Sequence, residues 1–493
     1  SSVLAANAFD TDRVPPGFSE PPKVAVVLPS AKYIEMMNGQ TERSFHYHLL
    51  SEPTYNLQNP FSLDADKFVD EVLAYCRQAK VDAVFAFDCF PAMLAAIVRN
   101  ALQLPGPSSW SVFLCCNKYY MRREISPNFG PISVIPNSPE SYPAVLKAAD
   151  TQFYVGTRIC QTEADWQTAL EDAKKGLLAT GFADRQQFYF KWGSQLGWPT
   201  GWSCPEDVVL AHSEPHIKGK GEYQAEVVVL VDGELVMADT GDIEKAPGTD
   251  AITLFKTPGT FMLTPALKAW LHAVAGQLAK CGYKSGAMDI EFMRLDRDVE
   301  AYELVEVNSR YSYMGNYLHF GLDAHAQSSS RHTERHQMME VRNLLNRTRL
   351  SLGACPQTLP SRDMPHVAKL AAMLYTSNIG PLNGIFDSDV LSALIGNGTL
   401  DAFAPKPVYV NGAVTDYDLR QYGGWAKIGC LLMTWEDKQD DVNAKLDTVI
   451  KQLFRGKDSG YLQVRVVDED GPGPTGLSPD ALESRRKKCC IIS

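Results

Sequence analysis

The stretch SGAMDIEFMRLDRDVEAYELVEVNSR, residues 285–310, carries charged side chains where β-strands usually carry apolar ones. The polar segment LDRDVE (295–300) predicts a turn between two strands. Because side chains alternate along a strand, Glu306, Asn308 and Arg310 should share one face of the second strand. The opposite face should take the residues between them: Val305, Val307 and Ser309. An acid, an amide and a guanidinium on one strand face predict a binding site.

The first strand of this hairpin supplies matching acids. Asp289 and Glu291 share a face, and a hairpin symmetric about 298–299 places Glu291 opposite Glu306. Cross-strand neighbours lie about 4.5–5.5 Å apart, where two carboxylates repel unless a shared proton or a cation neutralises them. Asn308 adds a neutral oxygen to the same face, which favours the cation. Ligands made only of oxygen suit Mg²⁺ or Mn²⁺ better than zinc.

Arg310 extends this face toward an anion. Mg²⁺ in such sites usually holds phosphate oxygens as well, and an arginine can bind a phosphoryl or carboxylate group through two hydrogen bonds. The alternative interpretation is an exposed strand face that carries ordinary surface charge.

The composition of the chain narrows the class of protein. The 493 residues suggest about three domains, and the 45% hydrophobic and 21% charged contents are typical of soluble globular proteins. A net charge of −11 argues against binding nucleic acid. Eleven cysteines without metal-type spacing predict mostly buried thiols in a reducing compartment. With no leader peptide and no apolar run of about 20 residues, we expect a cytosolic protein.

Periodicity predicts a small α/β domain near the start of the chain. The predicted elements are a buried strand at 23–30, a helix at 65–79, a strand at 81–88 and a helix at 91–106. Further along, we expect a helix at 163–177, a hairpin at 222–242 that turns at Asp232-Gly233, and a helix at 265–283. A strand, a turn and a helix within residues 365–465 predict a last α/β unit.

The strands at 285–310 resemble a known family. MDIEF and EVNSR are similar to the vEf and lEvNpR signatures of the ATP-grasp superfamily of carboxylate–amine ligases. Three more segments resemble motifs of that superfamily, in its order: LQLPGPSSWSVFLCCNKYYMRREI (102–125), YPAVLKAADTQFYVGTRI (142–159) and SEPHIKGKGEYQAEV (213–227). Agreement among four motifs over about 210 residues is more specific than any one of them.

The resemblance implies roles for individual residues. Lys118 and Lys147 would bind the phosphates of ATP, and Glu214 through Ile217 would line the adenine slot. Glu222 would hydrogen-bond a ribose hydroxyl. Glu291, Glu306 and Asn308 would hold Mg²⁺, or Mn²⁺, between the β- and γ-phosphates, and Arg310 would stabilise the transferred phosphoryl group. The segment 150–157 departs from the family pattern because it has one glycine where many members have several, which leaves open how it closes over ATP.

The resemblance also implies an α+β fold and a domain plan. The predicted parts are a disordered arm (1–22), a pre-ATP-grasp α/β domain (23–115), an ATP-grasp domain (116–340) with a lid at about 140–218, a C-terminal α/β domain (341–468) and a flexible tail (469–493). The implied reaction joins a small-molecule carboxylate to an amine through an acyl-phosphate, with release of ADP. A phosphotransferase or acid–thiol ligase of the same fold, and a nucleotide-binding scaffold without turnover, remain alternatives.

The end of the sequence suggests lipidation. Cys490-Ile-Ile-Ser493 fits the C-a-a-X pattern, in which a terminal Ser predicts farnesylation of Cys490. The basic run 485–488 and a possible palmitoylation site at Cys489 add further membrane signals. We therefore expect a cytoplasmic protein anchored peripherally to a cytosolic membrane face; the alternative is a frayed basic tail.

Overall fold

The computed structural model of the chain describes residues 17–29, 33–34, 37, 45–52, 63–125, 133–134, 139, 141–150, 157–179, 182–199, 211–216, 222–229, 232–245, 252–257, 264–295, 300–310, 348–353, 368–376, 380–381, 387–397, 399–400, 402–405, 413–414, 426–435 and 442–453. The predicted arm 1–22 falls largely outside these residues, and the tail 469–493 falls entirely outside them.

The N-terminal part is a small parallel sheet with helices, as periodicity predicts. Its strands pair in the order β2-β1-β3, and its elements are β1 (Lys23–Val27), β2 (His46–Leu50), α2 (Ala65–Ala79), β3 (Ala83–Phe85) and α3 (Cys89–Ala101). Val24 through Val27 are fully buried, which explains why β1 is an unbroken apolar run. Helix α3 ends at Ala101, a few residues before the predicted stop at Pro105 and Gly106, and Arg99 donates to the carbonyl oxygen of Pro107 at 2.6 Å in the turn that follows.

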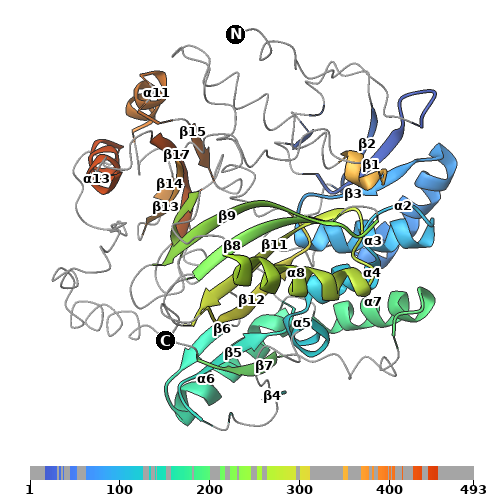
Figure 1. Ribbon diagram of the computed structural model, residues 1–493, viewed down its shortest axis with the longest axis horizontal. Helices are drawn as coiled ribbons and strands as arrows, with labels where there is room; N and C mark the ends of the chain where they lie inside the picture. Colours follow the sequence, from blue (N-terminus) through green and yellow to red (C-terminus); the bar gives the residue numbers. More distant parts are fainter. Residues whose placement is uncertain are drawn as a thin grey trace.

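A sheet of eight antiparallel strands forms the centre of the molecule (Figure 1). The strand order is β12-β11-β8-β9-β10-β13-β17-β15. The strands are β8 (Glu222–Val229), β9 (Leu235–Lys245), β10 (Ile252–Thr257), β11 (Gly286–Arg294), β12 (Tyr302–Asn308), β13 (Ala368–Thr376), β15 (Ala402–Pro405) and β17 (Ala426–Trp435). The predicted hairpin at 222–242 corresponds to β8 and β9.

The C-terminal strands continue this central sheet instead of forming a separate one. Strand β13 pairs with β10, and β17 pairs with β13. The remaining C-terminal elements are α11 (Ser388–Gly396), α13 (Val442–Leu453) and a two-stranded ribbon of β14 (Gly380–Pro381) and β16 (Ala413–Val414). The predicted strand and helix within 365–465 are thus present as β17 and α13.

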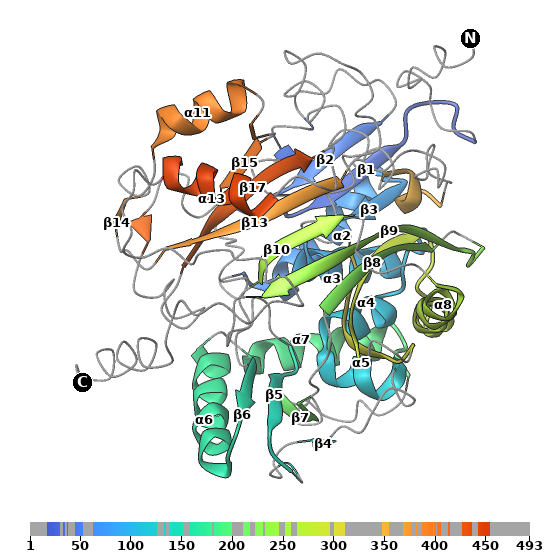
Figure 2. The ribbon, with the colours of Figure 1, turned by 60° about the vertical axis from the view of Figure 1, so that its left-hand side comes forward.

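A second antiparallel sheet, which we call the lid sheet, lies in a separate lobe below the central sheet (Figure 2). It has the order β4-β7-β5-β6, with β4 (Ser133–Val134), β5 (Ala144–Ala148), β6 (Thr157–Cys160) and β7 (Ala211–Pro215). Helix α6 (Glu163–Ala179) covers it and buries Trp166 completely in a small core of its own. Helix α7 (Phe182–Gln195) instead packs on the body of the protein, where Trp192 donates to Asp66 of α2 at 2.9 Å.

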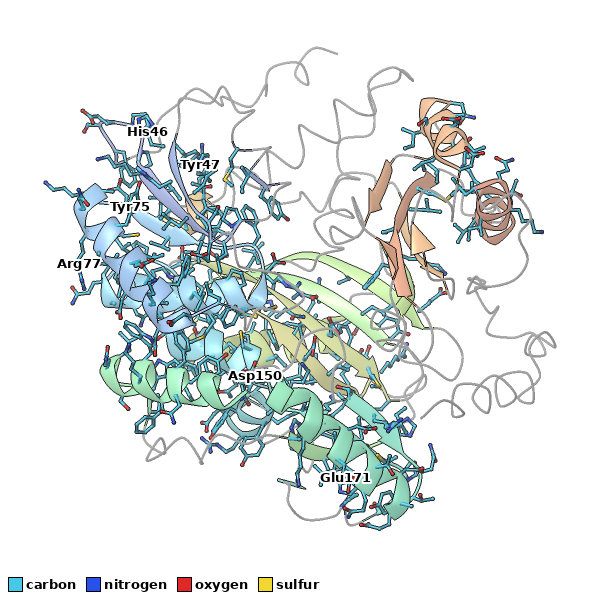
Figure 3. All side chains as sticks on the ribbon, turned by 180° about the vertical axis from the view of Figure 1, so that it is seen from behind. His46, Tyr47, Tyr75, Arg77, Asp150 and Glu171 are labelled. Carbon is cyan, nitrogen blue, oxygen red and sulfur yellow. The ribbon has the colours of Figure 1, made fainter. Side chains whose placement is uncertain are left out.

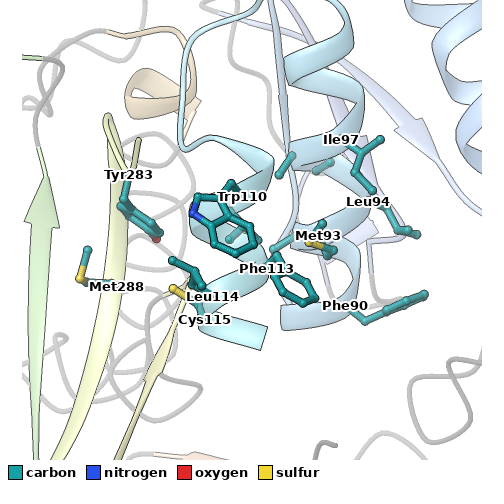
Figure 4. Close-up of a cluster of buried hydrophobic side chains, with 14 of the residues drawn as sticks. Phe90, Met93, Leu94, Ile97, Trp110, Phe113, Leu114, Cys115, Tyr283 and Met288 are labelled. Atoms are coloured by element: carbon teal, nitrogen blue, oxygen red, sulfur yellow. The ribbon is translucent and has the colours of Figure 1, made fainter. Parts of the chain in front are cut away.

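One large apolar core joins the N-terminal helices to the central sheet. Helix α4 (Ser109–Cys116) lies between α3 and β11, and its Trp110 and Phe113 contact side chains from both sides (Figure 4). Helices α5 (Lys118–Ile125) and α8 (Pro265–Lys280) pack on the same core. The strands β11 and β12, which carry the predicted site, therefore pack with one face against this buried apolar core.

Within the described residues, no helix combines the length and the apolar character needed to span a membrane.

We predict that Phe292→Ala lowers the free energy of unfolding by about 3–5 kcal/mol, because the ring is fully buried on β11 and contacts Trp270 at a centroid distance of 5.4 Å. Ile159→Ala, at a side chain 36% exposed on β6, should change it by less than about 0.5 kcal/mol. Urea denaturation measures both. Equal losses in the two variants would contradict this placement of the core.

Candidate active site

The predicted hairpin forms with the predicted register. Glu291 lies opposite Glu306, and Asp289 lies opposite Asn308. The pairing then shifts, so that Phe292 lies opposite Leu304 and Val305 is an extra residue in β12. The prediction that Val305 shares the inner face with Val307 is therefore wrong, because the bulge gives that place to Leu304, which is fully buried.

Asn308 lies at the centre of the acidic face. Its Nδ2 is 3.2 Å from Oδ2 of Asp289, 3.3 Å from Oε1 of Glu291 and 3.4 Å from Oε1 of Glu306. Three carboxylates from two strands thus converge on one amide group. Asp289, only 1% exposed, belongs to this cluster, although the sequence pattern singled out only Glu291 and Glu306 as ligands.

Lys118 approaches the cluster from the first turn of α5. Its Nζ lies 3.1 Å from Oε2 of Glu306. Burial alone would lower the pKa of Lys118, but Glu306 raises it above its ordinary value. Burial conversely favours the neutral form of Glu306, yet Lys118 holds the pKa of that carboxyl below its ordinary value. Both groups are therefore charged, and the lysine offsets part of the repulsion between Glu291 and Glu306.

Arg310 lies at the other side of Asn308 and contacts a thiol. Its Nε is 3.2 Å from Sγ of Cys89, and its Nη2 is 3.5 Å from Oδ1 of Asn308. Burial would lower the pKa of Arg310, but Cys89, Asp289 and Asp88 raise it. Burial raises the pKa of the Cys89 thiol. The sequence pattern did not identify Cys89, whose only signal is its position at the start of α3.

A second charged cluster lies on the lid sheet around Glu214. The carboxylate accepts from Arg122 at 2.8 and 3.0 Å, and it lies 2.8 Å from Nζ of Lys147 and 2.9 Å from Nε2 of His212. Burial opposes its charge, but Lys147 and Arg122 hold the pKa of Glu214 well below its ordinary value. Lys147 and Glu214, which the resemblance assigns to phosphate and adenine, are thus direct partners.

Arg122 also reaches the hairpin of the first cluster. Its Nη1 donates to Oε1 of Glu303 on β12 at 3.1 Å. Burial raises the pKa of Glu303 to about 6, even though Arg122 opposes that shift. Neither Arg122 nor Glu303 was predicted as a site residue, since each reads in sequence as an ordinary surface charge.

The remaining predicted residues cannot be placed. Ile217, Cys489 and Cys490 lie outside the described residues, and of Glu222 only the backbone, at the start of β8, is described. Most of the segment 150–157 is outside as well; Asp150 follows β5 where the lid lobe meets the body of the protein (Figure 3).

The acidic face fits a hard divalent cation. Glu291 and Glu306 supply carboxylate oxygens, while the neutral amide nitrogen of Asn308 faces them as a hydrogen-bond donor. The amide oxygen faces Arg310 and Cys89, so a reversed amide would add the third oxygen ligand. No cluster of three or more His, Cys, Asp or Glu side chains suited to a metal occurs among the residues that the structure describes. The fit therefore depends on the amide oxygen of Asn308 as well as on Glu291 and Glu306.

The fold is similar to that of several solved ligases and carboxylases. An L-amino acid ligase from Bacillus licheniformis matches with a TM-score of 0.61 and 13% identity over 88% of this chain and 98% of its own. N5-carboxyaminoimidazole synthase from Aspergillus clavatus, solved with ADP and 5-aminoimidazole ribonucleotide, matches with 0.56 and 14% over 88% and 99%. Biotin carboxylase from Campylobacter jejuni matches with 0.53 and 14% over 87% and 91%.

These similarities show the α+β fold that the ATP-grasp resemblance predicts. No model of a protein family matches the sequence. No curated protein matches it either.

We predict that Glu214→Gln lowers the free energy of unfolding at pH 7 by about 3–5 kcal/mol, because it leaves Arg122 and Lys147 buried without their carboxylate. A carboxyl whose pKa is depressed on folding stabilises the protein above its unfolded pKa, near 4.5, and loses that contribution as pH falls through the folded value. The difference between wild type and variant should therefore shrink below pH 4.5.

Urea denaturation at pH 7 and at pH 4 measures this difference. Glu171→Gln is the control, because Glu171 is exposed on α6 (Figure 3) and should change the free energy of unfolding by less than about 0.5 kcal/mol. A difference for Glu214→Gln that does not vary with pH would contradict the role of its charge.

Proposed function

We propose that this protein is an ATP-dependent carboxylate–amine ligase. The observation that carries the proposal is a pair of partly buried lysine–carboxylate contacts, one within the lid sheet and one between helix α5 and the central sheet. Lys147 of the lid sheet pairs with Glu214, and Lys118 pairs with Glu306 beside the acidic cluster. Two lysines from two lobes, next to oxygen ligands for a cation, suit a triphosphate held between the lobes.

Both lysines would exchange partners when the nucleotide binds. Each is 12–19% exposed at its side chain, so each is within reach of a ligand that enters between the lobes. Phosphate oxygens would replace the carboxylate of Glu306 at Lys118, which frees Glu306 for a cation. Glu214 retains Arg122 and His212 as partners when Lys147 turns to the phosphates, so its charge stays compensated.

The acidic face would hold Mg²⁺, or Mn²⁺, through Glu291, Glu306 and Asn308. A cation bound there supplies neutralisation of phosphate charge. Asp289 would hold Asn308 in place through its contact with Nδ2. The backbone and apolar groups near His216 would line the adenine slot, and Glu222 would bind the ribose.

The proposed reaction has two steps. An oxygen of the carboxylate substrate attacks the γ-phosphorus of ATP; the bond between that phosphorus and the bridging oxygen breaks, and ADP leaves. The amine then attacks the acyl carbon, a proton is lost from nitrogen, and phosphate leaves with the bonding pair of the acyl C–O bond. Arg310, fixed by Cys89 and Asn308, would stabilise the negative charge on the transferred phosphoryl group and on the tetrahedral intermediate.

Amino acids are the first substrates to test. The solved chain with the TM-score of 0.61 is an L-amino acid ligase, and the fold is shared along 88% of this chain. Fold similarity alone does not define substrates, because specificity depends on individual side chains of the site.

We predict that ADP release by the purified protein with ATP and Mg²⁺ occurs with pooled amino acids, which carry both a carboxylate and an amine, and does not occur with N-acetylated amino acids alone or amino acid amides alone. Glu306→Gln should reduce the rate more than ~100-fold, because it removes a charged oxygen ligand and the partner of Lys118. Glu171→Gln serves as the control and should keep the wild-type rate. A coupled assay of ADP, with mass spectrometry of the product, measures both effects.

Other outcomes of this assay identify the alternatives. ADP release with a carboxylate alone would indicate a phosphotransferase, and dependence on a thiol would indicate an acid–thiol ligase. Tight ATP binding without turnover under all of these conditions would indicate a scaffold. Full activity of Glu306→Gln would disprove the cation site.

We also propose that the C-terminal segment carries a farnesyl group on Cys490 and anchors the protein to a cytosolic membrane face. The support is the sequence motif with its basic run 485–488. The proposal requires that the chain ends at Ser493 before processing.

We predict that protein isolated from eukaryotic cells has a C-terminal peptide that ends at a farnesylated Cys490, and that Cys490→Ser abolishes the membrane-bound fraction. Mass spectrometry of that peptide and cell fractionation measure these results. An unmodified Cys490 followed by further residues would refute the proposal.

A further inference from the structure

Helix α5 contacts both the lid sheet and the central sheet through the same two residues. Lys118 and Arg122 are one turn apart and lie on the same side of the helix. The backbone N–H of Lys118 donates to the carbonyl oxygen of Ala149, at the end of β5, at 2.7 Å, while its Nζ contacts Glu306 on β12. Figures 1 and 2 show α5 between the two sheets.

Arg122 connects the two sheets through more hydrogen bonds than Lys118 does. Its guanidinium, 5% exposed, binds Glu214 of β7 through Nε and Nη2, and binds Glu303 of β12 through Nη1. Nη2 also lies 3.4 Å from the carbonyl oxygen of Val305. A planar guanidinium binds two acids in fixed directions, whereas an ammonium group is a compact charge whose three donors rotate freely.

The bulge at Val305 makes this arrangement possible. In a regular strand, Glu303 and Glu306 would point to opposite faces because they are three residues apart. The extra residue reverses the alternation between them, so Glu303 faces the same side as Glu306. Arg122 and Lys118, four residues apart on α5, therefore meet two acids of β12 on one face.

Arg122 is also linked to the phosphate-binding lysine of the lid. Glu214 is the shared partner of Arg122 and Lys147, with contacts of 2.8 Å to each. A displacement of Arg122 would therefore move Glu214 and Lys147 relative to Glu306 and Glu291. The distance between Lys147 and the acids of the β11–β12 hairpin determines whether one phosphate chain can contact both.

We propose that Arg122 is a positioning residue that fixes the lid lysine Lys147 relative to the cation-binding acids of the β11–β12 hairpin. The inference rests on the proposed function, since it assumes that a nucleoside triphosphate spans the two sheets. A ligand that contacts the lid sheet alone does not depend on this separation. A ligand that reaches the hairpin as well does depend on it, because small misplacements of reacting groups have large effects.

The test compares two nucleotides in the full-length protein. Under the proposed function, AMP with its single phosphate would contact the lid sheet alone, whereas the non-hydrolysable β,γ-imido analogue of ATP with Mg²⁺ would also contact the hairpin. Isothermal titration calorimetry gives the affinity for the ATP analogue divided by the affinity for AMP. In Arg122→Lys this ratio should fall at least ~10-fold, with AMP binding within about twofold of wild type.

Two further variants sharpen the comparison. Glu303→Met removes the carboxylate contact of Arg122 with β12, keeps only its longer contact with the Val305 carbonyl oxygen, and leaves Glu214 with Arg122, Lys147 and His212. It should therefore lower the same ratio even where Arg122→Lys fails to fold. Arg123→Lys is the matched control, because Arg123 is 43% exposed on the same helix and pairs with Glu124. It should leave the ratio unchanged.

The outcomes separate this inference from the proposed function. Equal losses for both nucleotides in Arg122→Lys and Glu303→Met would show that Arg122 only stabilises the fold, which overturns the inference. An unchanged ratio in both variants would overturn it as well, while ATP binding by the wild type would leave the proposed function intact. A wild-type protein that binds neither nucleotide would overturn both.

Discussion

The repulsion between Glu291 and Glu306, which face each other on neighbouring strands, is the constraint on which this structure depends. Two partly buried carboxylates at such a distance repel each other, and each surrounding group offsets part of that repulsion. Lys118 pairs with Glu306, the amide nitrogen of Asn308 contacts Glu291, Glu306 and Asp289, and Arg310 raises the positive potential on the far side of Asn308. These contacts are made by single side chains, so a bound cation could replace the Asn308 amide and a phosphate could replace Glu306 at Lys118.

On the lid sheet, the carboxylate of Glu214 is compensated by cations that contact it directly. Around Glu214 each charge has an opposite partner, since Arg122 and Lys147 both pair with it and Arg122 also pairs with Glu303. Burial lowers the pKa of His212, so this histidine acts there as a neutral hydrogen-bonding group. The lid sheet thus carries a compensated lysine–carboxylate pair, whereas the acids of the central sheet outnumber the cations of their own strands. Helix α5 connects the two because its Lys118 and Arg122 lie one turn apart.

Much of this was predictable because it depends on short-range rules. Alternation along the strands and the polar turn gave the β11–β12 hairpin with its register, including Glu291 opposite Glu306. Apolar runs and periodicity predicted β1, α2, α6, β8, β9 and α8 to within a few residues. The bulge at Val305 was not predictable, because no residue in that stretch is specific to a bulge. For the same reason Glu303 was not recognised as a neighbour of the site, while Cys89 was missed because its contact with Arg310 spans 221 residues of sequence.

The sequence by itself determined which chemistry is available: acids and an amide on one hairpin, an arginine at its end, and lysines in two segments that precede it. It could do so because strand alternation fixes side-chain direction within a few residues. Only the tertiary structure decided which charges meet. Arg122 joins Glu214 to Glu303 across 92 and 181 residues of sequence separation, respectively. Such pairs depend on how the sheets and α5 pack on one apolar core, and no local pattern encodes that packing.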